Sequence, residues 1–296
     1  MSRAERNVVR IVNAHRQREG GGFIVRRPFP TQELDAVDPF LLIDEMGPAD
    51  YGPGEAVGAP DHPHRGFETV TYMLEGEFEH EDSAGHRGTL RPGDVQWMTA
   101  GAGVIHSEMP SAEIRERGGR VHGFQIWVNL PAADKMMRPR YQELDTKHIP
   151  TARSEDGLAR VKVVAGEALG VRAKIDTLIP IVFQDWTLDP GADVSVNVPP
   201  EERAMVYVFG GRMQAGASGD TITDGQLAML GEGEALRLAN SGGEQARFLL
   251  LAGRPIGELV ARYGPFVMNT ESELRQAFED FRSGRMGEIT RQAQVG

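Results

Sequence analysis

The chain has 296 residues, of which 40% are apolar and 25% charged, as in a soluble globular protein large enough for two domains. Its 43 acidic residues outnumber 32 basic ones, and the net charge of −11 argues against direct binding to nucleic acid or to an anionic membrane surface. The absence of cysteine excludes disulfides, thiolate metal ligands, iron–sulfur clusters and a cysteine nucleophile.

The N-terminal segment does not have the pattern of a signal peptide. Arg10 and Asn13 interrupt its apolar residues, and no apolar run elsewhere in the chain approaches the length that spans a membrane. We therefore expect a cytoplasmic protein with no membrane partner and no direct nucleic-acid partner.

Short strands joined by turns are predicted along most of the chain. Its 36 glycines and 18 prolines are scattered singly and in pairs, which is typical of such a fold. Strands are expected to begin at Glu68 and to cover Asp94–Met98 and Phe124–Leu130, and a further one contains Val194, Val196 and Val198. In the last two segments, apolar residues alternate with others, so that one face of each strand meets a core.

One helix is predicted, near the C-terminal end. Thr270 followed by Glu273 has the spacing of a capping box, in which each side chain satisfies a free backbone donor. Apolar residues then recur at helical spacing from Leu274 to Phe281, and Gly284 is suited to end the helix. We expect this helix to pack on a sheet and to have a structural role.

The two halves of the chain resemble each other weakly. A Gly turn at 75–76 is followed by a second at 92–94, and turns at 210–211 and 224–225 repeat this arrangement. Residues 131–156, rich in Pro, Lys, Arg and Asp, indicate a connector. We predict an all-β protein with two similar barrels, an N-terminal metal-binding domain at 1–133, a linker at 134–156 and a C-terminal domain at 157–296 without metal ligands.

Histidine is confined to the first half of the chain. The eight histidines are His15, His62, His64, His80, His86, His106, His122 and His148. Only the first domain can therefore build a site from imidazole ligands.

His62 and His64 are the first candidate ligands. Side chains at i and i+2 of a strand point to the same face, so both imidazoles can reach one metal ion. Pro63 between them cannot donate to a sheet ladder, which places the pair at a strand edge or entry. By itself, a pair of this kind is a weak indication of a metal site, because exposed pairs of histidines are common.

His106 and Glu108 form a second pair at the same spacing, after a predicted strand and a Gly-rich turn. Together the two pairs give three imidazoles and a carboxylate, which suit a divalent first-row transition metal. Six-coordination leaves two positions for substrate, water or dioxygen. Glu68 is an even number of residues from His62 and His64, so on an unbroken strand its side chain would point to the same face. Spacing alone therefore does not decide whether Glu68 or Glu108 is the carboxylate ligand. The other reading of Glu68 is a supporting role near the site or an ion pair with Arg65.

Six segments of the chain resemble the pirin family of the cupin superfamily. They are Val37–Glu45 (VDPFLLIDE), His62–Val70 (HPHRGFETV), Pro92–Gly101 (PGDVQWMTAG), His106–Pro110 (HSEMP), His122–Leu130 (HGFQIWVNL) and Tyr263–Thr270 (YGPFVMNT). The resemblance spans nearly the whole chain. It departs from the general cupin pattern at Thr99, where many cupins carry proline, and in the later position of His106.

The resemblance implies a bicupin, with two double-stranded β-helix (jelly-roll) barrels and a short C-terminal helix. It also implies that His62, His64, His106 and Glu108 hold iron, which favours Glu108 over Glu68. The metal is expected to be Fe(II); ligand chemistry alone also admits Mn, Ni, Cu or Zn.

The resemblance implies two main functions, and the fold does not choose between them. The first is a quercetin 2,3-dioxygenase-type enzyme that cleaves a flavonol-like or other phenolic molecule with O₂ and releases carbon monoxide, with Glu108 as the catalytic base. The second is a metal- or redox-sensing regulator that binds a partner protein, as a transcriptional or metabolic co-regulator, without turnover. A structural or storage bicupin with an incidental metal is a third reading. We favour the enzyme.

Overall fold

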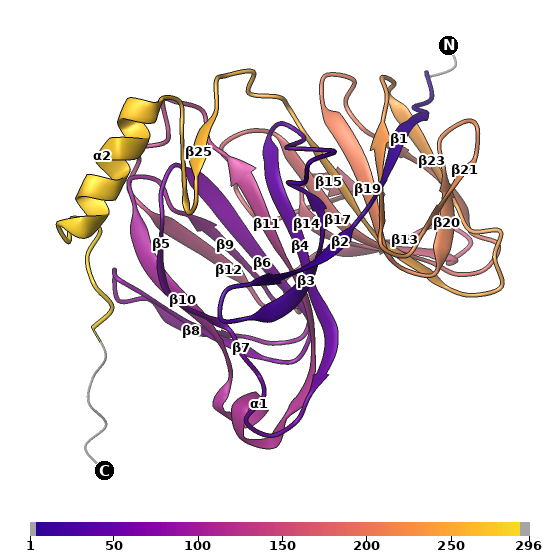
Figure 1. Ribbon diagram of the computed structural model, residues 1–296. Coiled ribbons are helices and arrows are strands. Elements are labelled where there is room, and N and C mark those ends of the chain that lie inside the picture. Colours follow the sequence, from indigo (N-terminus) through magenta and orange to yellow (C-terminus); the bar gives the residue numbers. More distant parts are fainter. Residues whose placement is uncertain (1–3, 291–296) are drawn as a thin grey trace. The chain divides into compact units, whose positions relative to one another are not determined.

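A computed structural model describes residues 4–290 and contains two compact units, each dominated by β-sheet (Figure 1). Within the described residues, the N-terminal unit comprises 16–26, 42–146 and 256–290, and the C-terminal unit comprises 4–15, 27–41 and 147–255. Each unit contains one seven-stranded and one four-stranded antiparallel sheet. The predicted all-β fold with two similar barrels is confirmed.

The large sheet of the N-terminal unit has the order β12-β9-β6-β11-β4-β3-β2, and the small sheet has the order β5-β10-β7-β8. The strands are β2 (His15–Glu19), β3 (Phe23–Phe29), β4 (Phe40–Tyr51), β5 (Ala59–His64), β6 (Phe67–Glu75), β7 (Phe78–Asp82), β8 (Arg87–Leu90), β9 (Val95–Thr99), β10 (Val104–Pro110), β11 (Gly119–Asn129) and β12 (Arg140–Leu144). β11 contains the predicted strand at 124–130, apart from its last residue, and its Phe124, Ile126 and Val128 are buried as expected.

The C-terminal unit repeats this plan with the orders β1-β22-β19-β24-β17-β14-β13 and β18-β23-β20-β21, and it adds the hairpin β15-β16. The strands are β1 (Val8–Asn13), β13 (Thr151–Arg153), β14 (Ala159–Ala165), β15 (Glu167–Ala168), β16 (Val171–Arg172), β17 (Ile181–Leu188), β18 (Asp193–Asn197), β19 (Arg203–Gly210), β20 (Arg212–Ala215), β21 (Asp220–Thr223), β22 (Gln226–Leu230), β23 (Ala235–Ala239) and β24 (Ala246–Gly253). Its core is apolar and includes the parallel rings of Trp186 and Phe248.

The predicted C-terminal helix is α2 (Glu271–Arg282), and its capping box between Thr270 and Glu273 is formed. Its apolar face packs on the hairpin of β25 (Ala261–Tyr263) and β26 (Phe266–Met268), where Phe266 and Ala277 are buried together (Figure 1). A second short helix, α1 (Ala112–Arg117), is capped by Ser111 and was not expected from the sequence. None of the helices in residues 4–290 is long and apolar enough to cross a membrane.

The two units divide the chain differently from the boundaries that the sequence predicts. Residues 256–290 belong to the N-terminal unit, although the predicted boundaries assign them to the second domain. The predicted linker at 134–156 contains β12, which pairs with β9, and β13, which pairs with β14. Composition marked this segment as a connector because its strands are short and largely polar. The boundaries at 133 and 157 stay a prediction about the two similar halves.

Candidate metal centre

Three of the predicted ligands meet where β5 pairs with β10. The two strands are antiparallel, and His62 lies directly opposite His106. Residues that face each other in an antiparallel pair point to the same side of the sheet, and His64 shares that side with His62 because it is two residues along. The short sheet therefore presents all three imidazoles on one face.

The three imidazoles lie close enough to share one ion. One ligand nitrogen from each of His62, His64 and His106 lies within 4.8 Å of the others. The ring centroids are 4.4 Å apart for His62 and His106, 4.7 Å for His62 and His64, and 4.9 Å for His64 and His106. Two imidazole nitrogens that bind one metal at about 2 Å each lie at most about 4 Å apart, so a small movement of these rings would bring all three nitrogens to bonding distance.

The ring nitrogens of this cluster are available for ligation. Both nitrogens of His106 and Nδ1 of His64 are buried without a hydrogen-bond partner. Burial and the neighbouring imidazoles lower the pKa of His64 and of His106 well below the ordinary histidine value, so both rings are neutral near pH 7. Neutral imidazole is the form that binds metals. A metal ion therefore fits these residues, and it would satisfy nitrogens that are otherwise buried at a cost.

The imidazole of His62 is oriented by the backbone. Its Nδ1 lies 2.7 Å from the carbonyl oxygen of Pro60, which accepts a hydrogen bond from the Nδ1–H tautomer. That tautomer leaves the lone pair on Nε2, so Nε2 is the nitrogen that can face a metal. A hydrogen bond from the second nitrogen is the usual support of a histidine ligand.

The carboxylate of Glu108 lies in the same interior but outside the group of three close ligand atoms. Glu108 is buried, and its two oxygens accept hydrogen bonds from Thr71 Oγ1 at 2.6 Å and Gln125 Nε2 at 2.8 Å. These partners orient the carboxylate from β6 and β11. The ligand role of Glu108 is therefore still a prediction.

Glu68 lies on the opposite face of β6 from Thr71, because the two residues are three positions apart on one strand. Its carboxylate accepts a hydrogen bond from Thr99 Oγ1 at 2.6 Å. The even spacing between Glu68 and the two histidines does not place them on one face, because the strand is interrupted. β5 ends at His64, and β6, which belongs to a different sheet, begins at Phe67. Glu68 is therefore not a candidate ligand, and it forms no ion pair with Arg65.

Further polar side chains lie on the same face of the small sheet as the candidate ligands. On β7, Asp82 lies opposite His106 and His80 lies opposite Glu108, so both point to the ligand side. His80 Nε2 lies 2.9 Å from a carboxylate oxygen of Glu143 on β12. His80 was counted among the histidines of the sequence, but only the register of β7 and β10 places it beside the candidate site.

Aromatic side chains form one wall of the site. The ring of His64 has edge contacts with Phe67 and Trp127, at centroid distances of 5.1 Å and 5.3 Å. Phe67 and Trp127 also pack on each other at 4.3 Å, and the guanidinium of Arg262 lies 5.0 Å from the Trp127 ring. A wall of this kind provides an apolar surface beside the three imidazoles.

The C-terminal tail supports the segment that follows His64. Arg65 is buried, and its guanidinium donates to the carbonyl of Ala102 and forms an ion pair with Asp280 of α2 at 2.7 Å. Gly66 has φ +87°, and a Cβ at this position would lie 2.0 Å from the carbonyl oxygen of Val267, so only glycine allows this approach. The sequence pattern did not connect α2 with the metal centre.

Lys135 holds the same segment from another side. Its buried ammonium donates to the carbonyls of Gly66 and Val267 and to the side chain of Asn129. Burial lowers the pKa of Lys135 to about 8. The three acceptors match the three N–H donors of a charged Lys135, so we infer that the ammonium form holds this turn in place.

Replacing Asp280 by asparagine is expected to destabilise the N-terminal unit by about 3 kcal/mol, because the buried Arg65 loses its counter-ion. Burial by itself would raise the pKa of this carboxyl, but hydrogen bonds from Gln276, Arg65 and Arg285 hold it at about 2. The Asp280 carboxylate is thus ionised throughout the physiological range. The measurement is the urea midpoint of unfolding.

The control for this substitution is Glu271→Gln, which removes an exposed ion pair with Arg275 on the same helix. Exposed pairs contribute little, so its midpoint should stay close to that of the unmodified protein. Equal midpoints for Asp280→Asn and Glu271→Gln would show that the Arg65–Asp280 pair does not support this unit.

Two family models match the chain. The model described as Pirin covers residues 22–128, and the model described as Pirin C-terminal cupin domain covers residues 183–287. The chain belongs to the pirin family. The resemblance in the sequence is thereby confirmed, and it includes both cupin halves.

Two curated members of the family and one solved structure show how far the likeness extends. A pirin-like protein of Solanum lycopersicum is 46% identical over 95% of this chain and 93% of its own, and pirin of Homo sapiens is 43% identical over 96% and 95%. A crystal structure titled quercetin 2,3-dioxygenase, from Acinetobacter baumannii, superposes with a TM-score of 0.90 at 37% identity and covers 97% of this chain and all of its own. The pirin bicupin fold is therefore secure for this chain.

Proposed function

We propose that the protein is an iron-dependent dioxygenase of the quercetin 2,3-dioxygenase type. The observation that carries the proposal is the cluster of His62, His64 and His106, in which Nδ1 of His64 and both nitrogens of His106 are buried without partners and burial lowers the pKa of these two rings. The similarity to a solved structure titled quercetin 2,3-dioxygenase supports the choice of reaction. The substrate class is a flavonol-like or other phenolic molecule, together with O₂.

The three histidines would hold the metal, and Glu108 is proposed as the fourth ligand. Fe(II) is the metal that we propose, although three imidazoles and a carboxylate also accept Mn, Ni, Cu or Zn. When bound, the metal supplies a Lewis-acidic and redox-active centre for a phenolic oxygen and O₂. Because ligands of this kind must be deprotonated, the low pKa of His64 and of His106 favours metal binding at neutral pH.

Glu108 is also the residue that we propose as the base for the phenolic proton. Its hydrogen bonds from Thr71 and Gln125 hold the carboxylate in the interior. Phe67 and Trp127 provide a flat apolar wall beside His64, suited to the aromatic rings of a flavonol. Each of these roles belongs to a residue that faces the same interior as the cluster.

The test is O₂ uptake by the Fe(II)-loaded protein with quercetin, followed with an oxygen electrode, and carbon monoxide release measured in parallel. We expect uptake that is saturable in quercetin and equimolar release of carbon monoxide, well above the rate of free iron at the same concentration. His106→Ala should fall to the free-iron rate. Equal rates for the loaded protein, the variant and free iron would reject the enzyme.

Glu108→Gln is expected to lower turnover by about 100-fold or more, because it removes both the proposed base and a charged ligand. The amide keeps the size of the side chain and can still accept a hydrogen bond from Thr71. The matched control is Glu68→Gln, a buried carboxylate on the other face of β6, which should keep its turnover. A similar loss of turnover in both variants would show that the loss comes from disturbed folding and not from the proposed role of Glu108.

A further inference from the structure

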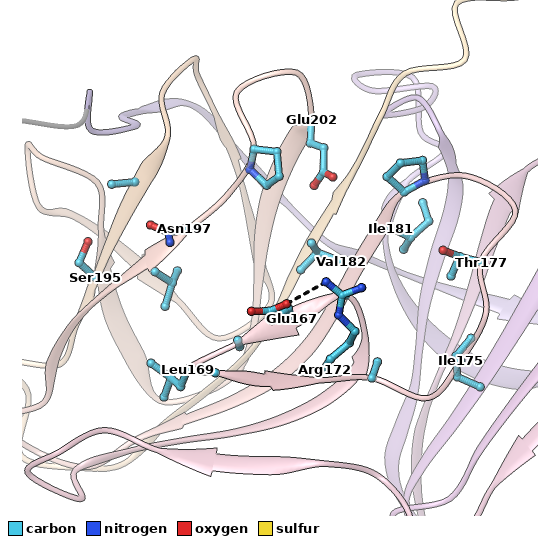
Figure 2. Close-up of a pocket in the computed structure, with 18 of the residues that line it drawn as sticks. Glu167, Leu169, Arg172, Ile175, Thr177, Ile181, Val182, Ser195, Asn197 and Glu202 are labelled. Carbon is cyan, nitrogen blue, oxygen red and sulfur yellow. Dashed lines mark hydrogen bonds and ion pairs between the residues drawn. The ribbon is translucent and has the colours of Figure 1, made fainter.

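The C-terminal unit contains a large open cavity of its own. Its volume is about 1290 Å³, and its walls come from the segment 166–182, which includes the hairpin β15-β16, and from β18 with the loop that follows it (Figure 2). Cavities of several hundred Å³ or more are typical of small-molecule sites. This unit contributes no histidine to the metal centre, and the proposed dioxygenase function leaves its cavity without a role.

A buried carboxyl group without a partner faces this cavity. Glu202 is 7% exposed, and its Oε2 is buried with no hydrogen-bond partner. Figure 2 shows its side chain extending from the loop after β18 into the cavity, towards the space above Glu167 and Arg172. A buried acceptor in this state costs free energy that a ligand able to donate a hydrogen bond can recover.

The charges of Arg6 and Arg254 both lower the pKa of Glu202, but neither residue forms an ion pair with its carboxylate. The guanidinium of Arg6 donates to the backbone carbonyls of Gly231, Pro199 and Glu202, and it forms no ion pair with the Glu202 carboxylate. Burial, together with the charge of Glu201, raises the pKa of Glu202 to about 7. The side chain is therefore held at a site that disfavours its charge, and a bound cation would relieve that penalty.

Most of the other charges of the cavity are also negative. Besides Glu202, its walls carry the carboxylates of Glu5, Glu167 and Asp176, and Arg172 is the single cationic side chain among the lining residues. Arg172 donates to Glu167 at 3.1 Å, and both side chains are largely exposed, so that pair lies on the open side. The cavity is acidic as a whole, which favours a positively charged ligand over an anionic one.

The other walls are apolar. Ile181, Val182 and Val196 are buried side chains that line the cavity, and Ile175 and Ala168 line it as well. These walls suit a compact hydrocarbon body, and Ser195, Thr177 and Asn197 add polar groups around it. The site thus combines apolar walls with one buried acidic group.

We propose that the C-terminal unit binds a small organic cation, a protonated amine on an apolar body, with the ammonium group on the Glu202 carboxylate. The ammonium donates a hydrogen bond to the carboxylate and forms the direct ion pair that Arg6 and Arg254 do not form. The apolar body packs against Ile181, Val182 and Val196. This site is separate from the three histidines and does not depend on the proposed dioxygenase function.

The test is isothermal titration of the full-length, Fe(II)-loaded protein with benzylammonium chloride at pH 8, where Glu202 is mostly ionised. Benzyl alcohol and sodium benzoate serve as the neutral and anionic probes of the same shape. We expect saturable binding of benzylammonium and at least about tenfold weaker binding of the other two. Glu202→Gln should weaken benzylammonium binding by about tenfold or more.

Two further variants locate the site. Glu201→Gln changes the neighbouring exposed carboxylate and should leave binding unchanged, whereas Ala168→Phe fills the cavity from the hairpin β15-β16 and should abolish it. Circular dichroism checks that each variant is folded. The proposal is overturned if benzylammonium does not bind, if it binds Glu202→Gln as tightly as the unmodified protein, or if benzoate binds equally well. If the amine binds only at the iron, Glu202→Gln will not change its affinity, and that result also overturns the proposal.

Discussion

His106→Ala is expected to remove the metal from the protein. Its imidazole lies opposite His62, and both of its nitrogens are buried without partners, so no other contact in the described structure substitutes for a metal bond. Loss of one of three imidazoles should weaken metal binding by more than about 100-fold, beyond the effect of changing a supporting residue. Protein reconstituted with Fe(II) and desalted should retain about one ion per chain before the substitution and only background afterwards.

Elemental analysis by mass spectrometry measures this content directly. The matched control is His15→Ala, which removes an exposed histidine of β2 that takes no part in the cluster. The control should retain its metal. Metal retained by His106→Ala at the level of the His15→Ala control would mean that the ion is bound elsewhere.

Glu202→Gln is expected to stabilise the protein at pH 8 by on the order of 3 kcal/mol and to have little effect at pH 4. The folded pKa of about 7 lies above the ordinary glutamate value, so the folded state binds the proton more tightly than the unfolded state. Stability from this group is therefore fully present below the unfolded pKa and is lost as the pH rises through the folded pKa. Glutamine removes the charge and hence this loss.

The difference in the free energy of unfolding between the unmodified protein and Glu202→Gln is measured by urea unfolding at pH 4 and pH 8, followed by circular dichroism. Glu201→Gln is the control, because the neighbouring carboxylate is exposed and interacts with Arg254 at the surface. It should show no comparable gain at pH 8. A gain of equal size at both pH values would contradict the titration of Glu202 and would indicate a change in packing instead.

The features that the sequence predicted correctly depend on local patterns. The capping box of Thr270 and Glu273 spans four residues, and alternation along Phe124–Asn129 depends on one strand. Spacing also places His62 and His64 on one face. The opposition of His62 and His106 depends on the pairing of β5 with β10, whereas the family resemblance had implied only that both residues hold the same metal.

The features that the sequence did not predict depend on distant contacts or on breaks in a pattern. Arg65 and Asp280 are 215 positions apart, and no periodicity connects them. Glu68 was a candidate because parity was counted across residues 64–67, where one strand ends and the next begins in another sheet. Glu202 follows two prolines in an acidic stretch, and its burial becomes visible only once the cavity walls are in place.

The central claim is that His62, His64 and His106 bind one metal ion. The most direct test is an anomalous-difference map at the iron absorption edge, from a crystal of the Fe(II)-loaded protein. We predict a single strong peak within bonding distance of one nitrogen from each of the three imidazoles, at Nε2 in the case of His62, with the Glu108 carboxylate as the fourth protein ligand. A map without a peak at the three histidines, or with its strongest peak elsewhere, would contradict this account.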